Sequence, residues 1–125
     1  MIEIFLLMIL ALVVDDFVLQ PVCLSKLKQK SWWETQDGYK SLYNNDYKMA
    51  LLMHSMSWSI MILLPVIITN DIPEIVLFSA FIVNTLIHYY IDDMKANKGK
   101  INLMVDQFVH IMQIITTWIA ICQWI

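Results

Sequence analysis

Four long apolar stretches limit what this chain can fold into. By residue number they cover 2–20, 48–69, 72–94 and 101–124 of a 125-residue sequence in which only 15% of the residues are charged. Each stretch is close to the roughly 20 residues with which an α-helix crosses about 30 Å of hydrocarbon. None shows the apolar-polar alternation of barrel strands, and helices satisfy their own backbone groups in lipid. We therefore predict an all-α polytopic membrane protein, a single domain over residues 1–125 built as a four-transmembrane-helix bundle.

The placement of lysine predicts the orientation of these helices. The chain has no arginine, and its lysines lie between the first and second stretches or between the third and fourth. The connection at residues 70–74 has none. By the positive-inside rule, loops 21–47 and 94–100 are cytoplasmic and both termini lie outside, as expected for a bacterial inner (cytoplasmic) membrane. The long loop mixes lysines with aromatic residues, so it either lies on anionic headgroups of membrane lipid or is an ordinary solvated loop.

Polar residues inside the apolar stretches are the candidate functional residues. The predicted topology brings six ionisable ones to one depth near the cytoplasmic face: Asp16, His54, His88, Asp92, Asp106 and His110. His88 and Asp92 are four residues apart, as are Asp106 and His110, so each pair projects from one face of its helix. We expect these polar faces, together with Asn84, to point inward. Ionisable residues are costly to insert into lipid and mark functional sites by default.

Three interpretations of this cluster stay open. In the first, the side chains only hydrogen-bond across helices and hold the bundle together. In the second, which we favour, they bind one or two divalent transition metal ions, such as zinc, manganese or iron, because imidazole and carboxylate together suit these metals. In the third, they relay protons or other ions, although residues 60–69 of the second helix are nearly all apolar. The dispersed lysines and a net charge of −3 argue against a nucleic-acid partner.

Four short motifs give the chain a resemblance to known proteins. They are Asp16-Phe17-Val18-Leu19-Gln20, His54, His88-Tyr89-Tyr90-Ile91-Asp92 and Asp106-Gln107-Phe108-Val109-His110. In this order they resemble a bacterial and phage family of small four-helix integral-membrane proteins of unknown function, whose pattern reads D-F-x-x-Q, H, H-x-x-x-D and D-Q-x-x-H. The pattern is also distantly similar to that of membrane-bound metal-dependent hydrolases. The resemblance covers nearly the whole chain and carries over to the six cluster residues, Gln20 and Gln107, but it implies no settled reaction.

The metal interpretation leads to a working mechanism. We expect the six cluster residues to be the metal ligands, with Gln20, Asn84 and Gln107 around them. A bound ion would activate water and polarise a phosphoryl or acyl oxygen, and Asp16 is our first choice as general base. The substrate of such a metal-dependent hydrolase would be a lipid or phosphorylated amphiphile at the cytoplasmic leaflet. Its anionic group would meet the lysines of the second cytoplasmic loop, Lys95, Lys98 and Lys100.

Two alternatives to an enzyme stay open as well. One is an ion- or proton-conducting or transport bundle. The other is a phage-encoded membrane scaffold with a structural His/Asp cluster, acting through a host protein partner; a homo-oligomer is equally open. Asp15 departs from the family pattern. It lies about 100° round an α-helix from Asp16, so we expect it to face lysines or headgroups.

Overall fold

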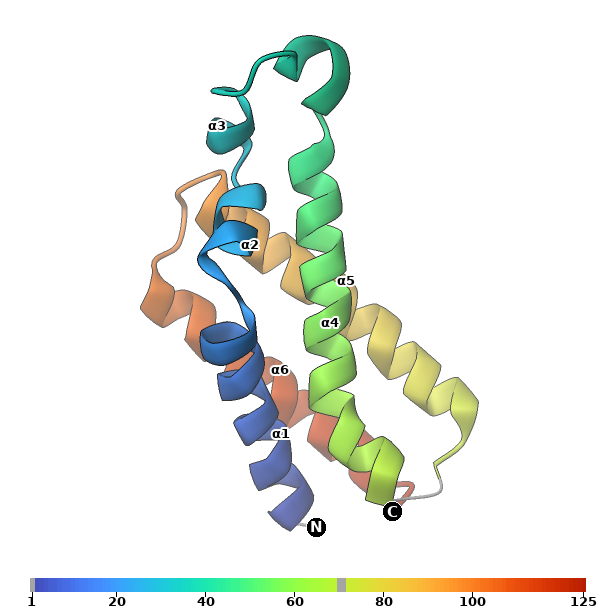
Figure 1. The fold of residues 1–125 in the computed structure, drawn as a ribbon. Coiled ribbons are helices and arrows are strands. Elements are labelled where there is room, and N and C mark those ends of the chain that lie inside the picture. The colour runs from blue at the N-terminus through green and yellow to red at the C-terminus, as the bar shows by residue number, and fades with distance from the viewer. Residues whose placement is uncertain (1, 70–71) are drawn as a thin grey trace.

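The computed structural model of the protein describes residues 2–69 and 72–125. Every regular element among these residues is helical (Figure 1), so the prediction of an all-α fold is confirmed for the described part of the chain. The elements in chain order are α1 (Ile2–Val14), the π-helical η1 (Asp15–Leu19), α2 (Val22–Leu27), α3 (Lys30–Trp33), the π-helical η2 (Tyr39–Tyr43), α4 (Asp46–Thr69), α5 (Glu74–Ala96) and α6 (Leu103–Cys122).

Within residues 2–69 and 72–125, three helices, rather than the predicted four, are long and apolar enough to cross a membrane: α4, α5 and α6. The prediction of a first spanning helix over residues 2–20 was wrong in this respect. The α-helix α1 has 13 residues, which at 1.5 Å per residue is about 20 Å, well short of about 30 Å of hydrocarbon. It ends where Asp15 and Asp16 begin the wider π-helical turn of η1. The predicted bundle of four spanning helices is therefore replaced by three long helices and one short helix.

The boundaries of the long helices follow local backbone chemistry. α5 begins at Glu74 instead of residue 72, because a residue before a proline, here Pro73, disfavours the helical backbone. It continues to Ala96, so part of the predicted loop 94–100 is helical. α6 begins after Asn102, whose side chain accepts a hydrogen bond from the backbone N–H of Val105 and caps the helix. Within the predicted connection at 70–74, residues 70 and 71 lie outside the described part.

Apolar side chains cover the outside of the molecule. Large hydrophobic side chains that are exposed outnumber the buried hydrophobic ones, and on α5 they include Phe78, Val83 and Leu86. A monomeric protein in water rarely exposes continuous apolar surface of this extent. The outer surface of the helices is thus of the kind found at membrane or protein contacts.

The buried residues separate into an apolar half and a polar half. The apolar half lies toward the two chain termini, which are at the same end of the molecule (Figure 1), and includes Met8, Ile62 and Ile121. Toward the opposite end, the buried side chains of α5 and α6 are mostly polar. Trp58, fully buried on α4, lies at the boundary because it belongs to the apolar core and also stacks on His88.

The segment predicted as cytoplasmic loop 21–47 is folded back onto the helices. It contains the short helices α2 and α3, and the indole N–H of Trp33 donates to the Leu27 carbonyl at 2.8 Å. Asn97, just after α5, holds it from the other side: its Oδ1 accepts from the Lys30 backbone N–H at 2.7 Å, and its Nδ2 donates to the Lys28 carbonyl at 3.1 Å. Hydrogen bonds thus fix this segment to the polar end of the molecule.

The position of Trp58 generates a stability prediction. We expect Trp58→Ala to lower the free energy of unfolding by about 3–5 kcal/mol, because it removes a fully buried side chain from the core and from its stack on His88. Phe78→Ala, at an exposed aromatic residue of α5, is the matched control and should change the free energy of unfolding by about 0.5 kcal/mol or less. Chemical unfolding in detergent micelles measures both. Equal losses in the two variants would contradict the assignment of the core.

Candidate metal centre

Two consecutive aspartates enter the interior from η1. Asp15 accepts a hydrogen bond from the Ser57 hydroxyl at 3.1 Å, and Asp16 accepts one from the Gln107 side-chain amide at 2.9 Å. The expectation that Asp15 faces lysines or headgroups was wrong, because Asp15 is only 2% exposed. The π-helical turn is wider than an α-helical one and rotates successive side chains by a smaller angle, so both carboxylates point toward α4 and α6.

The paired residues of α5 and α6 meet inside the molecule. His88 and Asp92 share the buried face of α5, and Asp106 and His110 share that of α6, as their spacing of four residues predicts. His110 Nε2 lies 3.7 Å from Asp92 Oδ1 and 3.4 Å from Asp106 Oδ1. On α4, His54 is also buried, and its Nε2 lies 3.5 Å from Asp92 Oδ2. Asp92 is therefore near imidazoles from two other helices.

The imidazole rings are held by stacking. The ring centroids of His88 and His110 are 4.2 Å apart with an interplanar angle of 21°, and those of His88 and Trp58 are 4.4 Å apart at 26°. His54 packs on His88 at 5.0 Å between centroids. His88 thus lies between the Trp58 indole and two other imidazoles, and ring packing fixes its orientation.

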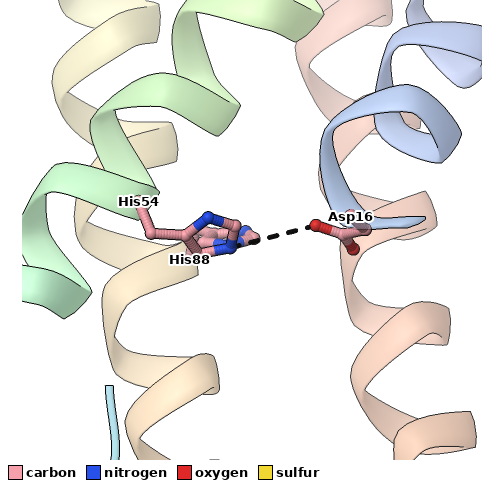
Figure 2. A group of neighbouring side chains, drawn as sticks. All are labelled: Asp16, His54 and His88. Atoms are coloured by element: carbon pink, nitrogen blue, oxygen red, sulfur yellow. Dashed lines mark ion pairs between the residues drawn. The ribbon is translucent and has the colours of Figure 1, made fainter. Parts of the chain in front are cut away.

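Five of the predicted site residues come close enough together to contribute ligand atoms to shared sites. Two groups, Asp16 with His54 and His88, and His88 with Asp92 and His110, each have one potential ligand atom per residue within 4.8 Å of the others. Figure 2 shows the first group, with the carboxylate of Asp16 facing the imidazoles of α4 and α5. His88 belongs to both groups. The sixth residue, Asp106, joins them through its 3.4 Å approach to His110.

The buried polar atoms of this centre are only partly satisfied. Among the described residues, neither ring nitrogen of His88 or of His110 has a hydrogen-bond partner, and Asp16 Oδ1 and Asp106 Oδ1 have none either. Buried polar atoms are nearly always hydrogen-bonded, since an unpaired one costs about 1–3 kcal/mol. Such a concentration of unpaired donors and acceptors is typical of a site that binds something.

Two lysines also form ion pairs with the carboxylates of the centre. Lys28 Nζ lies 2.6 Å from Asp92 Oδ2, and the side chains of both residues are almost completely buried. Lys95 pairs with Asp106 from the C-terminal end of α5. Lys98, which we expected at the same mouth, pairs instead with Asp93 on the outside, at 2.9 Å. Sequence reasoning missed Lys28 as a site residue, because its position in a polar segment gave no signal that it is buried.

The three predicted surrounding amides divide into two kinds. Gln20 accepts a hydrogen bond from Lys28 at 3.1 Å, and Gln107 donates to Asp16 and to Asp106, at 2.9 and 3.3 Å. Both therefore contact charged groups of the centre. Asn84 lies one helical turn from His88 but bonds away from it: its side chain pairs with Thr117, and its backbone carbonyl accepts from Gln113 at 2.8 Å.

A small cavity of about 90 Å³ opens beside the centre, between η1, α5 and α6. Its polar lining includes Asp16, Asp92 and Lys95. Phe17 and Leu103, which are exposed on the outside of the molecule, supply the apolar part of the lining. The cavity therefore gives access to two of the carboxylates from a surface that is otherwise apolar.

Comparison with known proteins places the chain in a family without assigning an activity. The family model described as "Protein of unknown function (DUF3307)" matches residues 4–124, which is nearly the whole chain. No curated protein and no solved structure matches. The chemistry of the site must therefore be argued from its own residues.

The Lys28–Asp92 pair generates a second stability prediction. We expect Asp92→Asn to lower the free energy of unfolding of the metal-free protein by about 3–5 kcal/mol, because it leaves the Lys28 ammonium buried without its carboxylate. The matched control is Asp93→Asn, which affects an ion pair at the surface and should cost at most about 1 kcal/mol. Both are measured by chemical unfolding in detergent with a chelator present. A loss at Asp92 no larger than that at Asp93 would contradict the role of this pair.

Proposed function

The chain belongs to a family of unknown function, DUF3307, and we propose from the residues of its own site that it is a membrane-embedded protein that binds a divalent transition metal. One observation carries the proposal. The imidazole nitrogens and carboxylate oxygens of the centre face one another at separations of 3.4–3.9 Å. Most of these separations are too long for a good hydrogen bond.

These separations suit ligands of a common ion. Two atoms that lie about 2.0–2.2 Å from one tetrahedral zinc are about 3.3–3.6 Å apart. The N···O separations in the group of His88, Asp92 and His110 are 3.7–3.8 Å, so small side-chain movements bring these atoms to coordinating distance. Imidazole and carboxylate donors suit zinc, manganese and iron. Because His88 belongs to both groups of ligands, the centre has room for one ion or for two neighbouring ions.

The charge of the site favours a divalent cation. Four buried or nearly buried carboxylates, those of Asp15, Asp16, Asp92 and Asp106, face only two ammonium groups, those of Lys28 and Lys95. These carboxylates outnumber the ammonium groups, and carboxylates away from water need positive charge beside them, which a bound divalent ion would supply.

The membrane location rests on the apolar outer faces and on the three helices of suitable length and composition. We place the polar end, which carries the lysines of α2 and of the α5–α6 connection, at the cytoplasmic side by the positive-inside rule. Both chain termini, at the opposite end, then lie outside (Figure 1). The metal centre lies under the cytoplasmic surface, within reach of lipid headgroups.

The proposed reaction is hydrolysis of a lipid or phosphorylated amphiphile. A bound divalent ion supplies a Lewis acid that activates water and polarises a phosphoryl oxygen. His88, Asp92 and His110 would hold the ion, and Asp16 Oδ1, which has no hydrogen-bond partner among the described residues, would take a proton from the attacking water. The water oxygen bonds to phosphorus, the ester P–O bond breaks, and the proton passes to the leaving alcohol. Lys95, which lines the cavity, contacts the anionic group.

A second candidate function, a proton or ion pathway, is favoured by polar side chains that lie deeper than the histidines. Asn84 and Thr117 hydrogen-bond between α5 and α6, and Thr85 donates to Ser59 of α4 at 3.0 Å. Farther toward the termini, the buried side chains of α4 become apolar, beginning with Ile62. The polar layer thus extends the centre by about one helical turn without crossing the apolar core of α4.

Metal content tests the proposed function. We expect purified wild-type protein to bind one or two equivalents of zinc or manganese per chain, as measured by elemental analysis and calorimetric titration. His88→Ala should abolish binding, because His88 belongs to both ligand groups. His54→Ala and His110→Ala each leave one group intact, so a two-ion centre should fall to one equivalent in either variant.

The matched control for these variants is Asp93→Asn, which changes a carboxylate next to the centre that is paired with Lys98 on the outside. It should bind metal as the wild type does. Absence of metal from wild-type protein after saturation, with unfolding unchanged by a chelator, would refute the metal centre.

Ion flux separates the two candidate functions. We expect proteoliposomes containing the wild-type protein to show no more proton or cation flux than protein-free liposomes, because the buried side chains of α4 beyond the polar layer are apolar. Fluorescent pH and ion indicators inside the vesicles measure this. A flux that Asp92→Asn abolishes would favour the pathway over the enzyme.

A further inference from the structure

Lys28 reaches the metal centre from outside the long helices. Its side chain is buried, and its ammonium group bonds to Asp92 Oδ2 at 2.6 Å and to Gln20 Oε1 at 3.1 Å. Burying a lysine costs free energy, because the ammonium group loses its hydration and the side chain loses conformational freedom. A site that contains a buried lysine therefore needs the positive charge that this residue supplies. Asn97 fixes the backbone directly after the Lys28 side chain, by donating to the carbonyl of Lys28 and accepting from the N–H of Lys30.

Lys28 and Lys95 have equivalent positions around the centre. Each places an ammonium group on the Oδ2 atom of one carboxylate: Lys28 on that of Asp92 and Lys95 on that of Asp106. The other oxygen, Oδ1, of both carboxylates faces His110, at 3.7 and 3.4 Å. In the absence of a divalent ion, the two ammonium groups are the cations that balance these carboxylates.

Binding of a divalent ion changes this balance. An ion held by His88, Asp92 and His110 would add positive charge beside the carboxylates, and the attraction that holds each ammonium group to its carboxylate would weaken. The two ammonium groups repel the ion. An anion placed next to both the ammonium groups and the ion would lower this electrostatic repulsion. The lysines are therefore available to an anionic ligand mainly when the metal is present.

The cavity of about 90 Å³ is where such an anion fits. Lys95 lines it, and so do Gln20 and Asp92, the two side chains that hold the Lys28 ammonium group. The cavity is large enough for several water molecules or for a group of phosphate size. Phe17 and Leu103 on its lining face the apolar outside of the molecule.

We propose that this cavity is a metal-dependent binding site for the phosphate group of a monoester of an apolar alcohol, with Lys95 on its lining as the ammonium contact and Lys28, behind Gln20 and Asp92, as a second positive charge. The proposal rests on the metal centre proposed above and names the substrate class of that site. The phosphate would lie beside Lys95 and next to the residues that would hold the metal, and the alcohol chain would extend past Phe17 and Leu103.

Calorimetry with inorganic phosphate and with monohexyl phosphate tests this site in detergent-solubilised full-length protein. We expect both probes to bind the manganese-loaded protein, monohexyl phosphate more tightly, and neither to bind the metal-free protein. Lys28→Met and Lys95→Met should each weaken phosphate binding by about 10- to 100-fold, as expected for loss of a positive charge beside the anion, while manganese affinity is kept or raised. Lys26→Met is the matched control, because Lys26 is an exposed lysine of the same short helix and should leave phosphate binding unchanged.

Two lysine variants are used so that the test does not depend on the folding of either one. Lys95 is about one-third exposed, so Lys95→Met keeps the proposal testable where Lys28→Met does not fold. Phosphate binding that is equal with and without manganese would overturn the proposal, as would unchanged phosphate affinity in a folded lysine variant. Failure of the wild-type protein to bind manganese would instead refute the metal centre, so the two proposals fail in different measurements.

Discussion

Burial of negative charge among apolar helices is the constraint on which the rest of the structure depends. Asp15, Asp92 and Asp106 are each at most 2% exposed, in a molecule whose outside is apolar. Carboxylates in such surroundings need opposite charges or several hydrogen-bond donors. The structure supplies both, from Lys28 and Lys95 and from the side chains of Ser57 and Gln107, and each of these comes from a different part of the chain.

This constraint explains two irregular features of the fold. The change from α- to π-helix after Val14 turns both Asp15 and Asp16 inward, which a regular α-helix would not do. The segment after Gln20 folds back into short helices instead of remaining solvated, since Lys28 must reach Asp92. The irregular backbone is therefore found where charged groups are brought together, whereas the regular helices carry the apolar core.

Periodicity and spacing predicted those parts of the molecule that depend on local sequence. Long apolar stretches indicated α4, α5 and α6, and the four-residue spacing of His88 and Asp92 correctly predicted a shared helix face. The shortness of α1 and the inward turn of Asp15 could not be predicted, because the π-helical turn depends on partners from α4 and α6. Lys28 was missed for the same reason: the positive-inside rule counts lysines in a loop without regard to tertiary contacts.

The way in which the histidines are held argues for ligand binding over a purely structural cluster. Structural histidines in a protein interior are oriented by hydrogen bonds through their ring nitrogens. Here His88 is held by stacking on Trp58 and on His110, and none of the four ring nitrogens of His88 and His110 has a hydrogen-bond partner among the described residues. The apolar core holds Trp58, and Trp58 in turn holds the imidazole rings of His88 and His110 by packing. The orientation of these rings therefore does not depend on hydrogen bonds from their nitrogens. Ring nitrogens that are held by packing and not by hydrogen bonds need only small movements to bind a ligand.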